Sequence, residues 1–387
     1  MKTIESMYRR LSKVVVSLIV IAAVMAFNTK SPAEVSERNG KTKDQTIMLA
    51  LLLDTSNSMD GLIDQAKSQL WKIVNDLAAA KTSDGSRPNI KIALYEYGND
   101  GLPALEGYIR QVSPFTQDLD VISEKLFALT TNGGNEFCGH VIKTSLNQLS
   151  WSSSPADVKM IFIAGNEAFT QGEVPYRAAC SMAKEKNVIV NTIFCGNFGE
   201  GVESGWKTGA VITGGSYMSI EQNNKTVYIP TPYDEKIEAM NERLNNTYVY
   251  YGREGSARKQ LQSLQDKNAG SYGLSNMVER AVCKSSYAYD NSSWDLVDAY
   301  KADETVITKA KTEDLPAEMK GMTGEQRKAY VVKKSIERAN IQKDIQLLNT
   351  KRQEYILRNP SAENDAMLDA AMIKTVREYA KTKDLTW

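Results

Sequence analysis

The sequence predicts an α/β protein: a doubly wound, mostly parallel sheet of six strands flanked by helices, followed by a mainly helical C-terminal extension. Short apolar runs alternate with segments of helical periodicity between residues 46 and 221. Beyond residue 221 the apolar runs stop, and charged segments with helical periodicity replace them. The order of strand, helix, two strands and then three helix and strand repeats gives a doubly wound sheet with one antiparallel edge.

The first strand is predicted from seven consecutive apolar residues, 47–53. This run is too short to cross a membrane, and turn formers bound it, which is typical of a strand buried on both faces of a parallel sheet. Apolar residues then recur at helical spacing over 62–77, with charged residues between them. This pattern predicts an amphipathic helix of about four turns.

The later elements are predicted from the same two periodicities. Alternation over 89–98 predicts a second strand, and 106–112 can pair with it as a third. Further strands are predicted at 158–165, 188–196 and 215–220, with helices at 118–129, 138–149, 176–187 and 202–212. In the extension, helices are predicted at 235–245, within 255–283, where Gly270 and Gly273 are breakers, and over 325–357, and a short strand is predicted at 248–252. The apolar residues of 325–357 lie at heptad-like positions, with Arg352 interrupting them: Ile341, Ile345, Leu348 and Tyr355.

These patterns divide the chain into an N-terminal segment 1–27, a polar linker 28–45, an α/β domain 46–221, a mixed extension 222–312 packed on it, and a helical region 313–387. The N-terminal segment has a basic start and an uncharged apolar run, 14–27, followed by polar residues. This composition is typical of a secretory signal peptide, and an uncleaved signal anchor is the alternative. The protein is therefore expected in the periplasm or outside the cell, with the membrane reached only through that anchor.

Composition excludes several classes of function. The 47 basic and 47 acidic residues give a formal net charge of zero, so neither nucleic acid nor an anionic membrane surface is expected as a partner. His140 is the only histidine, and the chain has no Walker loop and no zinc motif. An enzymatic function is therefore not expected.

Four cysteines in an exported chain allow one or two disulfides. Cys138 and Cys195 both fall at the predicted carboxyl edge of the sheet and could form one, and Cys180 with Cys195 is a rival pairing. Free buried thiols are the alternative. A catalytic pair of Cys138 with His140 is not expected, because a spacing of two residues on a helix points their side chains to different faces.

A cluster of side-chain oxygens follows the first predicted strand. Asp54 ends the apolar run, and Ser56 and Ser58 follow it. Open α/β sheets bind their ligands at the carboxyl ends of the strands, so these oxygens are expected to converge there. Oxygen ligands of this kind suit a hard divalent cation such as Mg²⁺, Ca²⁺ or Mn²⁺. The alternative role for the two serines is to cap the helix that follows.

The sequence Asp54-Thr55-Ser56-Asn57-Ser58, placed after a buried strand and before an amphipathic helix, resembles the DxSxS signature of von Willebrand factor type A (vWA) domains. In that family the signature opens the metal-ion-dependent adhesion site. The strand order expected over roughly 46–221 is similar to the vWA fold as well.

The resemblance implies further ligands from two later loops. The glycine pair 133–134 aligns with a glycine pair of the family, and Asn135, followed by Glu136, stands where the family has threonine. In the third loop the family has Asp-Gly, and here Asn166 or Glu167 would have to reach the metal. Oxygen atoms of asparagine and glutamate are still suitable ligands for a hard cation.

The function that the resemblance implies is an exported protein-binding module. A divalent cation would engage an acidic group of a partner protein, at a site formed by Asp54, Ser56, Ser58, Asn135, Glu136 and Glu167. The alternative is a scaffold of the cell envelope with a degenerate, metal-free site, in which the C-terminal helices carry assembly.

Overall fold

The computed structural model describes residues 45–224, 228–359 and 367–387. The predicted signal segment 1–27 and the linker up to residue 44 lie outside the described residues. The described residues belong to one compact unit, Asp44–Trp387. Within them, no helix has both the length and the apolar character needed to cross a membrane.

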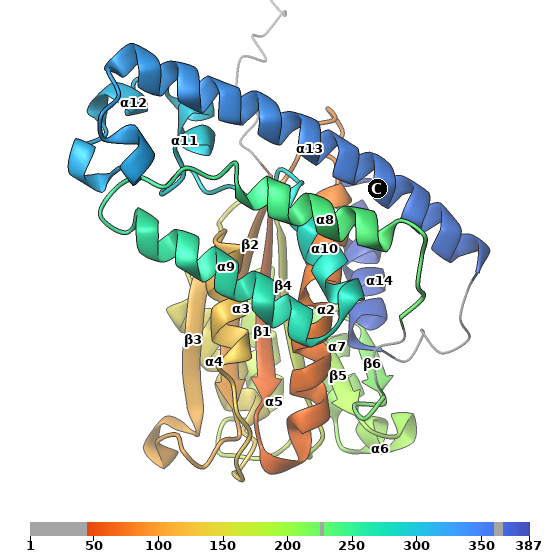
Figure 1. Ribbon diagram of the computed structural model, residues 1–387. Coiled ribbons are helices and arrows are strands. Elements are labelled where there is room, and N and C mark those ends of the chain that lie inside the picture. The colour runs from red at the N-terminus through yellow and green to blue at the C-terminus, as the bar shows by residue number, and fades with distance from the viewer. Residues whose placement is uncertain (1–44, 225–227, 360–366) are drawn as a thin grey trace, which may run out of the picture. The chain divides into compact units, whose positions relative to one another are not determined.

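The centre of this unit is a six-stranded sheet with the order β3-β2-β1-β4-β5-β6 (Figure 1). Its strands are β1 (Thr46–Asp54), β2 (Asn89–Tyr97), β3 (Ile109–Thr116), β4 (Val158–Gly165), β5 (Ile189–Cys195) and β6 (Tyr217–Ile220). All neighbours pair in parallel except β2 and β3, which pair antiparallel at one edge. The predicted fold class is therefore confirmed.

The apolar run of β1 serves two cores, one on each face of the sheet. Leu49, Leu51 and Leu53 pack into the first core, whereas Ala50 and Leu52 pack into the second. Because consecutive strand residues point to opposite faces, a strand covered on both sides must be apolar throughout. This is why the run over 47–53 identified the central strand.

Helices cover both faces of the sheet. The second core is closed by α4 (Cys138–Gln148), α5 (Tyr176–Glu185) and α7 (Trp206–Thr213), with α6 (Phe198–Glu203) beside β6. The first core is closed by α2 (Asp60–Ala79), α3 (Leu119–Phe127) and α14 (Leu368–Lys381). The chain thus returns to the sheet with its last helix, which packs along α2 and contacts β4 and β6.

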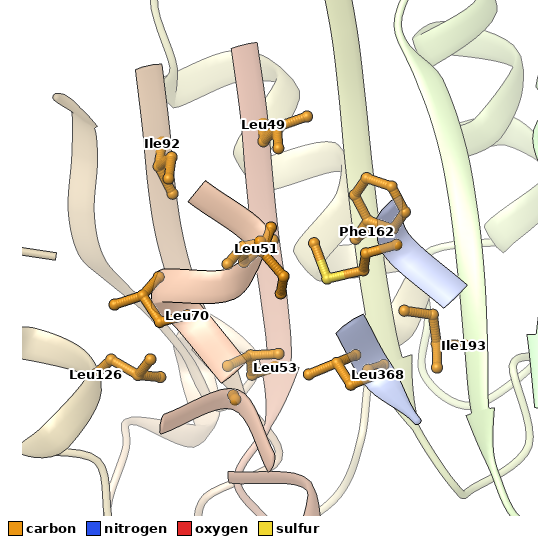
Figure 2. Close-up of a pocket in the computed structure, with 13 residues that line it drawn as sticks. Leu49, Leu51, Leu53, Leu70, Ile92, Leu126, Phe162, Ile193 and Leu368 are labelled. Carbon is orange, nitrogen blue, oxygen red and sulfur yellow. The ribbon is translucent and has the colours of Figure 1, made fainter. Parts of the chain in front are cut away.

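Figure 2 shows how α14 completes the first core. Leu368 of α14 lies with Leu53, Leu70 and Ile193 around an apolar cavity of only about 20 Å³. Leu368 and Met372 are each about 2% exposed. The C-terminal helix is therefore part of the sheet's hydrophobic core.

The described residues of the extension form the helices α8 (Asp234–Asn245), α9 (Gly255–Ser271), α10 (Leu274–Lys284), α11 (Leu296–Ala302), α12 (Val306–Lys309) and α13 (Gly324–Arg358). The helices predicted at 235–245 and 325–357 are confirmed, and the region 255–283 divides after Ser271 as its glycines indicated. A capping box between Thr323 and Gln326 begins α13.

The strand predicted at 248–252 is wrong. Only Tyr250 makes a β-bridge there, to Asp295, and no ladder continues from it. The aromatic residues of this segment, which suggested a strand, pack in the core instead. Tyr248 is buried and its ring stacks on that of Trp294. Tertiary contacts override β-propensity in this segment.

Buried ion pairs connect the extension helices to one another and to α3. Arg280 of α10 donates to Asp120 of α3 over 2.8 Å. Arg352 of α13 donates to Asp234 of α8 at 2.9 Å and to Glu279 of α10 at 2.7 Å. Arg352 interrupts the apolar pattern of its helix because it faces these acids.

All four cysteines are buried and free, so of the alternatives that the sequence left open, free buried thiols are the one found in this structure. Burial raises the pKa of the Cys138 thiol well above its usual value and that of Cys180 to about 12. The Cys138 thiol lies 3.8 Å from the Tyr97 hydroxyl, and the ring of His140 packs at Gly107. The cysteines therefore behave as small apolar core residues.

Candidate metal centre

The candidate site lies where three loops meet at the carboxyl edge of the sheet. Asp54 is the last residue of β1, which lies between β2 and β4, and its side chain is fully buried. The chain leaves β1 for α2 on one face and enters β4 from α4 on the other face. In open α/β sheets, such a change of face marks the position at which ligands bind.

In the described part of the chain, one of the two carboxylate oxygens of Asp54 has a hydrogen-bond partner and the other has none. Its Oδ1 accepts a hydrogen bond from the backbone N–H of Ser56 at 2.8 Å, which fixes the turn after the strand. Its Oδ2 is buried and has no hydrogen-bond partner among the described residues. A buried acceptor left in this state costs free energy unless something binds it.

The two serines of the signature do not cap a helix. Ser56 precedes the 3-10 turn Asn57–Met59 without a side-chain capping bond, and Met59 precedes α2. The Oγ atoms of Ser56 and Ser58 lie 3.4 Å apart, and that of Ser58 accepts a hydrogen bond of 3.0 Å from Nδ2 of Asn166. The capping alternative is therefore wrong, and both hydroxyls belong to the cluster.

The second loop contributes Glu136. The loop is attached to the first by the backbone N–H of Asn132, which donates to the carbonyl of Thr55 at 3.0 Å. The backbone N–H of Glu136 donates to Oε1 of Gln171 at 2.8 Å, and its own side chain is only 3% exposed. Asn135, by contrast, is exposed at the rim.

Gly98 allows the two carboxylates to lie together. A Cβ atom at this position would lie 2.8 Å from Oδ1 of Asp54 and 2.9 Å from Cγ of Glu136. Gly98 also has a φ of +82°, in the left-handed region that favours glycine. Any larger residue would push the Asp54 and Glu136 side chains apart.

This proximity shows in the electrostatics of the site. Burial, followed by the hydrogen bond and the charge of Glu136, raises the pKa of Asp54 well above its ordinary value of 3.8. Burial also raises the pKa of Glu136, helped by the nearby charge of Glu167 and opposed by hydrogen bonds with Asp54 and Ser56. Both carboxyls therefore resist ionisation unless a positive charge lies between them.

The third loop presents Asn166. Its Nδ2 holds Ser58, while its Oδ1 is buried without a partner in the described part of the chain. Glu167 is exposed, and its backbone carbonyl accepts a 2.8 Å hydrogen bond from the indole of Trp206. The side chain of Asn166, directly after the strand end at Gly165, is thus the one that enters the cluster.

The structure places the six predicted site residues in two groups. Four lie in the cluster: Asp54, Ser56, Ser58 and Glu136. Asn135 and Glu167 lie on its exposed rim. The sequence named Asn166 only as the alternative to Glu167, and its position after the strand is the signal that favours it. No sequence pattern indicated Gln171, which holds the second loop in place.

The donor set fits a hard divalent cation. Three buried oxygens without partners among the described residues come from three different loops: Asp54 Oδ2, Glu136 Oε2 and Asn166 Oδ1. The described residues contain no group of three or more His, Cys, Asp or Glu side chains suited to a metal. The set consists instead of two carboxylates, two hydroxyls and one amide oxygen, which are the ligand types that Mg²⁺, Ca²⁺ and Mn²⁺ accept.

The strand order and the loop define the class: a doubly wound α/β protein with a DxSxS loop directly after its first strand, at the carboxyl edge of its sheet. No family model matches the chain, and no curated protein matches it. A search of solved structures returns vWA domains, the class that the sequence resembles.

Three of these structures illustrate the likeness. BatB from Bacteroides thetaiotaomicron is 15% identical with a TM-score of 0.34, covering 45% of this chain and 90% of BatB. The SpRpn10 VWA domain is 16% identical with a TM-score of 0.35, over 45% and 88% of the two chains. Proximal thread matrix protein 1 from the mussel byssus, with a zinc-occupied MIDAS motif, is 12% identical with a TM-score of 0.33, over 46% and 42%.

Proposed function

We propose that this protein is a protein-binding module whose divalent cation engages an acidic group of a partner. The cation would be Mg²⁺, Ca²⁺ or Mn²⁺, held by Asp54, Ser56, Ser58, Glu136 and Asn166. The observation that carries this proposal is the set of three unpartnered, buried oxygens contributed by three loops at one edge of the sheet. The exported location expected from the sequence is compatible with this role.

Each loop has a distinct part in this mechanism. When bound, the cation supplies a coordination position that a carboxylate of a partner can complete. The carboxylates of Asp54 and Glu136 balance its charge, so partner binding depends on the open position more than on net attraction. The amide of Asn166 orients the Ser58 hydroxyl, and the exposed Asn135 and Glu167 border the approach.

Calorimetric titration of the full chain with Mg²⁺, Ca²⁺ and Mn²⁺ tests the site. Wild type is expected to bind at least one of these cations, and Asp54→Ala is expected to bind none while keeping its circular dichroism spectrum. Glu185→Ala is the matched control, because Glu185 is exposed at the end of α5, on the opposite edge of the sheet. No heat from wild type would overturn the cation site.

Partner binding needs a second measurement. Proteins retained by the immobilised wild-type chain are expected to be released by a chelator and absent from the Asp54→Ala chain. A phosphatase and protease assay with added Mn²⁺ separates the binding module from a metal-dependent hydrolase, which would show turnover. Retention that is indifferent to both chelator and Asp54→Ala would refute a cation-mediated contact.

A metal-free scaffold is the second candidate. It is favoured by the raised pKa values of Asp54 and Glu136, because two such carboxyls can share a proton instead of a cation. Deleting the C-terminal helices cannot test it, since α14 is part of the core. The double variant Ile336→Ser, Leu347→Ser can test the scaffold, because these apolar side chains on α13 are 59% and 55% exposed and their loss does not disturb the core. A scaffold would lose its assemblies on this change and show no heat with cations.

A further inference from the structure

A second cavity, of about 120 Å³, lies between the α/β layers and the extension. Its walls come from α2, α10 and α13, with Tyr228 before α8 and Tyr272 between α9 and α10. None of the residues that line this cavity belongs to the candidate metal centre. The cavity is small compared with the roughly 300–1,000 Å³ of pockets for drug-sized ligands, so it suits a molecule of one or two rings.

The three charged side chains that line this cavity are already paired. Arg352 binds Asp234 at 2.9 Å and Glu279 at 2.7 Å. Lys72 forms an ion pair with Asp369. Because each charge has a counter-charge from the protein, the cavity has no unpaired cation among its described lining residues to hold a phosphate or a carboxylate. Its chemistry favours a neutral ligand.

One polar side chain in the wall is different. Asn276 is 4% exposed, and both its Nδ2 and its Oδ1 are buried without a hydrogen-bond partner in the described residues. A carboxamide presents these two atoms side by side in one plane, one as a donor and the other as an acceptor. Buried amides are normally satisfied, so this one points to a ligand that carries the complementary pair.

We propose that this cavity binds a small, neutral, planar ring with a hydrogen-bond donor and acceptor next to each other, the edge that adenine presents at N6 and N7. Asparagine forms a bidentate pair with this edge of adenine. The tyrosine hydroxyls are bonded elsewhere, that of Tyr228 to Asp234 and that of Tyr272 to Asp64, so the rings remain to contact a flat ligand.

Titration of the full chain with adenine in the presence of a chelator tests this proposal. Adenine is expected to bind, and purine, which lacks the amino group at position 6, is expected to bind at least about tenfold more weakly. Asn276→Leu is expected to weaken adenine binding by a similar factor. Its melting temperature should not fall, since the change removes an unsatisfied buried amide. Asn340→Leu makes the same chemical change on the exposed face of α13 and should bind as wild type.

Two results would overturn the proposal: no binding of adenine to wild type, or equal affinities for adenine and purine. Unchanged binding by a folded Asn276→Leu would do the same. The Asp54→Ala variant should bind adenine as wild type does, so failure here is distinct from failure of the cation site. Loss of adenine binding in Asp54→Ala would assign the ligand to the metal centre and refute this cavity as its site.

Discussion

If Asp54 serves a cation, it should destabilise the fold when the cation is removed. Its Oδ2 is buried without a partner in the described chain, and burial, together with the neighbouring carboxyl of Glu136, raises the pKa of Asp54. Asp54→Asn keeps an oxygen for the Ser56 backbone N–H and replaces the second oxygen with an amide that can donate to Glu136. The variant is therefore expected to be more stable than wild type without metal.

The magnitude follows from the cost of the unpartnered oxygen. Leaving a fully buried acceptor unsatisfied costs about 1–3 kcal/mol, so Asp54→Asn should raise the free energy of unfolding by that amount at pH 7. The folded pKa of Asp54 lies above its ordinary value of 3.8. Its ionisation thus opposes folding, and this cost appears as the pH rises through the folded pKa. Below about pH 4 the difference between variant and wild type should vanish.

Urea unfolding followed by circular dichroism measures the free energies of unfolding of wild type and Asp54→Asn, first with a chelator and then with a cation. At about 100 times its dissociation constant, a bound cation should stabilise wild type by about 2.7 kcal/mol and leave Asp54→Asn unchanged. The control Glu185→Gln, on an exposed residue, should stay within about 0.5 kcal/mol of wild type in both conditions.

Two outcomes would refute this reasoning. If Asp54→Asn were less stable than wild type in the chelator at pH 7, Asp54 would be making stabilising contacts of its own. If the cation stabilised wild type and variant equally, it would bind elsewhere. Either result would remove the physical basis of the metal centre.

Three other predictions concern the core and the loops. Arg338→Met should cost about 3–5 kcal/mol in urea unfolding, because it leaves Asp295, its fully buried partner at 2.6 Å, without a counter-charge; a loss under about 1 kcal/mol would contradict this. Gly134→Ala should abolish cation binding in calorimetry with the sheet intact, since its Cβ would lie 2.3 Å from the carbonyl oxygen of Gly98; unchanged affinity would count against the loop geometry. A thiol reagent should modify no cysteine in the native chain and all four after unfolding without reductant, whereas fewer than four would reveal a disulfide.

The sheet was predictable because its strands are buried on both faces. The run over 158–165 was predicted as a strand, and β4 has those same bounds. The segment 248–252 failed for the opposite reason: its aromatic residues have β-propensity, but the guanidinium of Arg338 lies 3.9 Å from the ring centroid of Tyr248. Contacts with a helix about ninety residues later in the chain decide that conformation.

The first loop of the site was predictable and the other two only in part. Asp54 is fixed by the strand end, which the apolar run locates. In the third loop, Glu167 was predicted as the metal ligand, with Asn166 as the alternative. The structure shows that the side chain of Asn166 contacts Ser58 in the cluster. The Glu167 carbonyl is held by Trp206, from a helix that follows the next strand. Because Trp206 is distant from Glu167 in the sequence, the residues around Glu167 could not indicate this contact.

The heptad-like pattern of α13 shows a similar limit. Ile341 and Ile345 are buried as the spacing predicted, but Tyr355 is 37% exposed. Arg352, which breaks the pattern, is buried between acids of α8 and α10. Hydrophobic periodicity locates a helix and its apolar face, yet it cannot show that an arginine on that face has acidic partners at distant positions.

The long helix of the extension lies away from the candidate metal centre. In Figure 1, α13 crosses the end of the sheet at which β1 begins, whereas the loops after β1 and β4 lie at the other end. Tyr287 of the extension donates to the carbonyl of Pro88, directly before β2, whereas Tyr272 donates to Asp64 near the start of α2. Within the described residues, the ion pairs of the extension and the oxygens of the site share no residue. The core and the ion pairs of the extension can therefore supply stability while Asp54 and Glu136 stay together in a buried place that opposes their ionisation, a cost that a bound cation would offset.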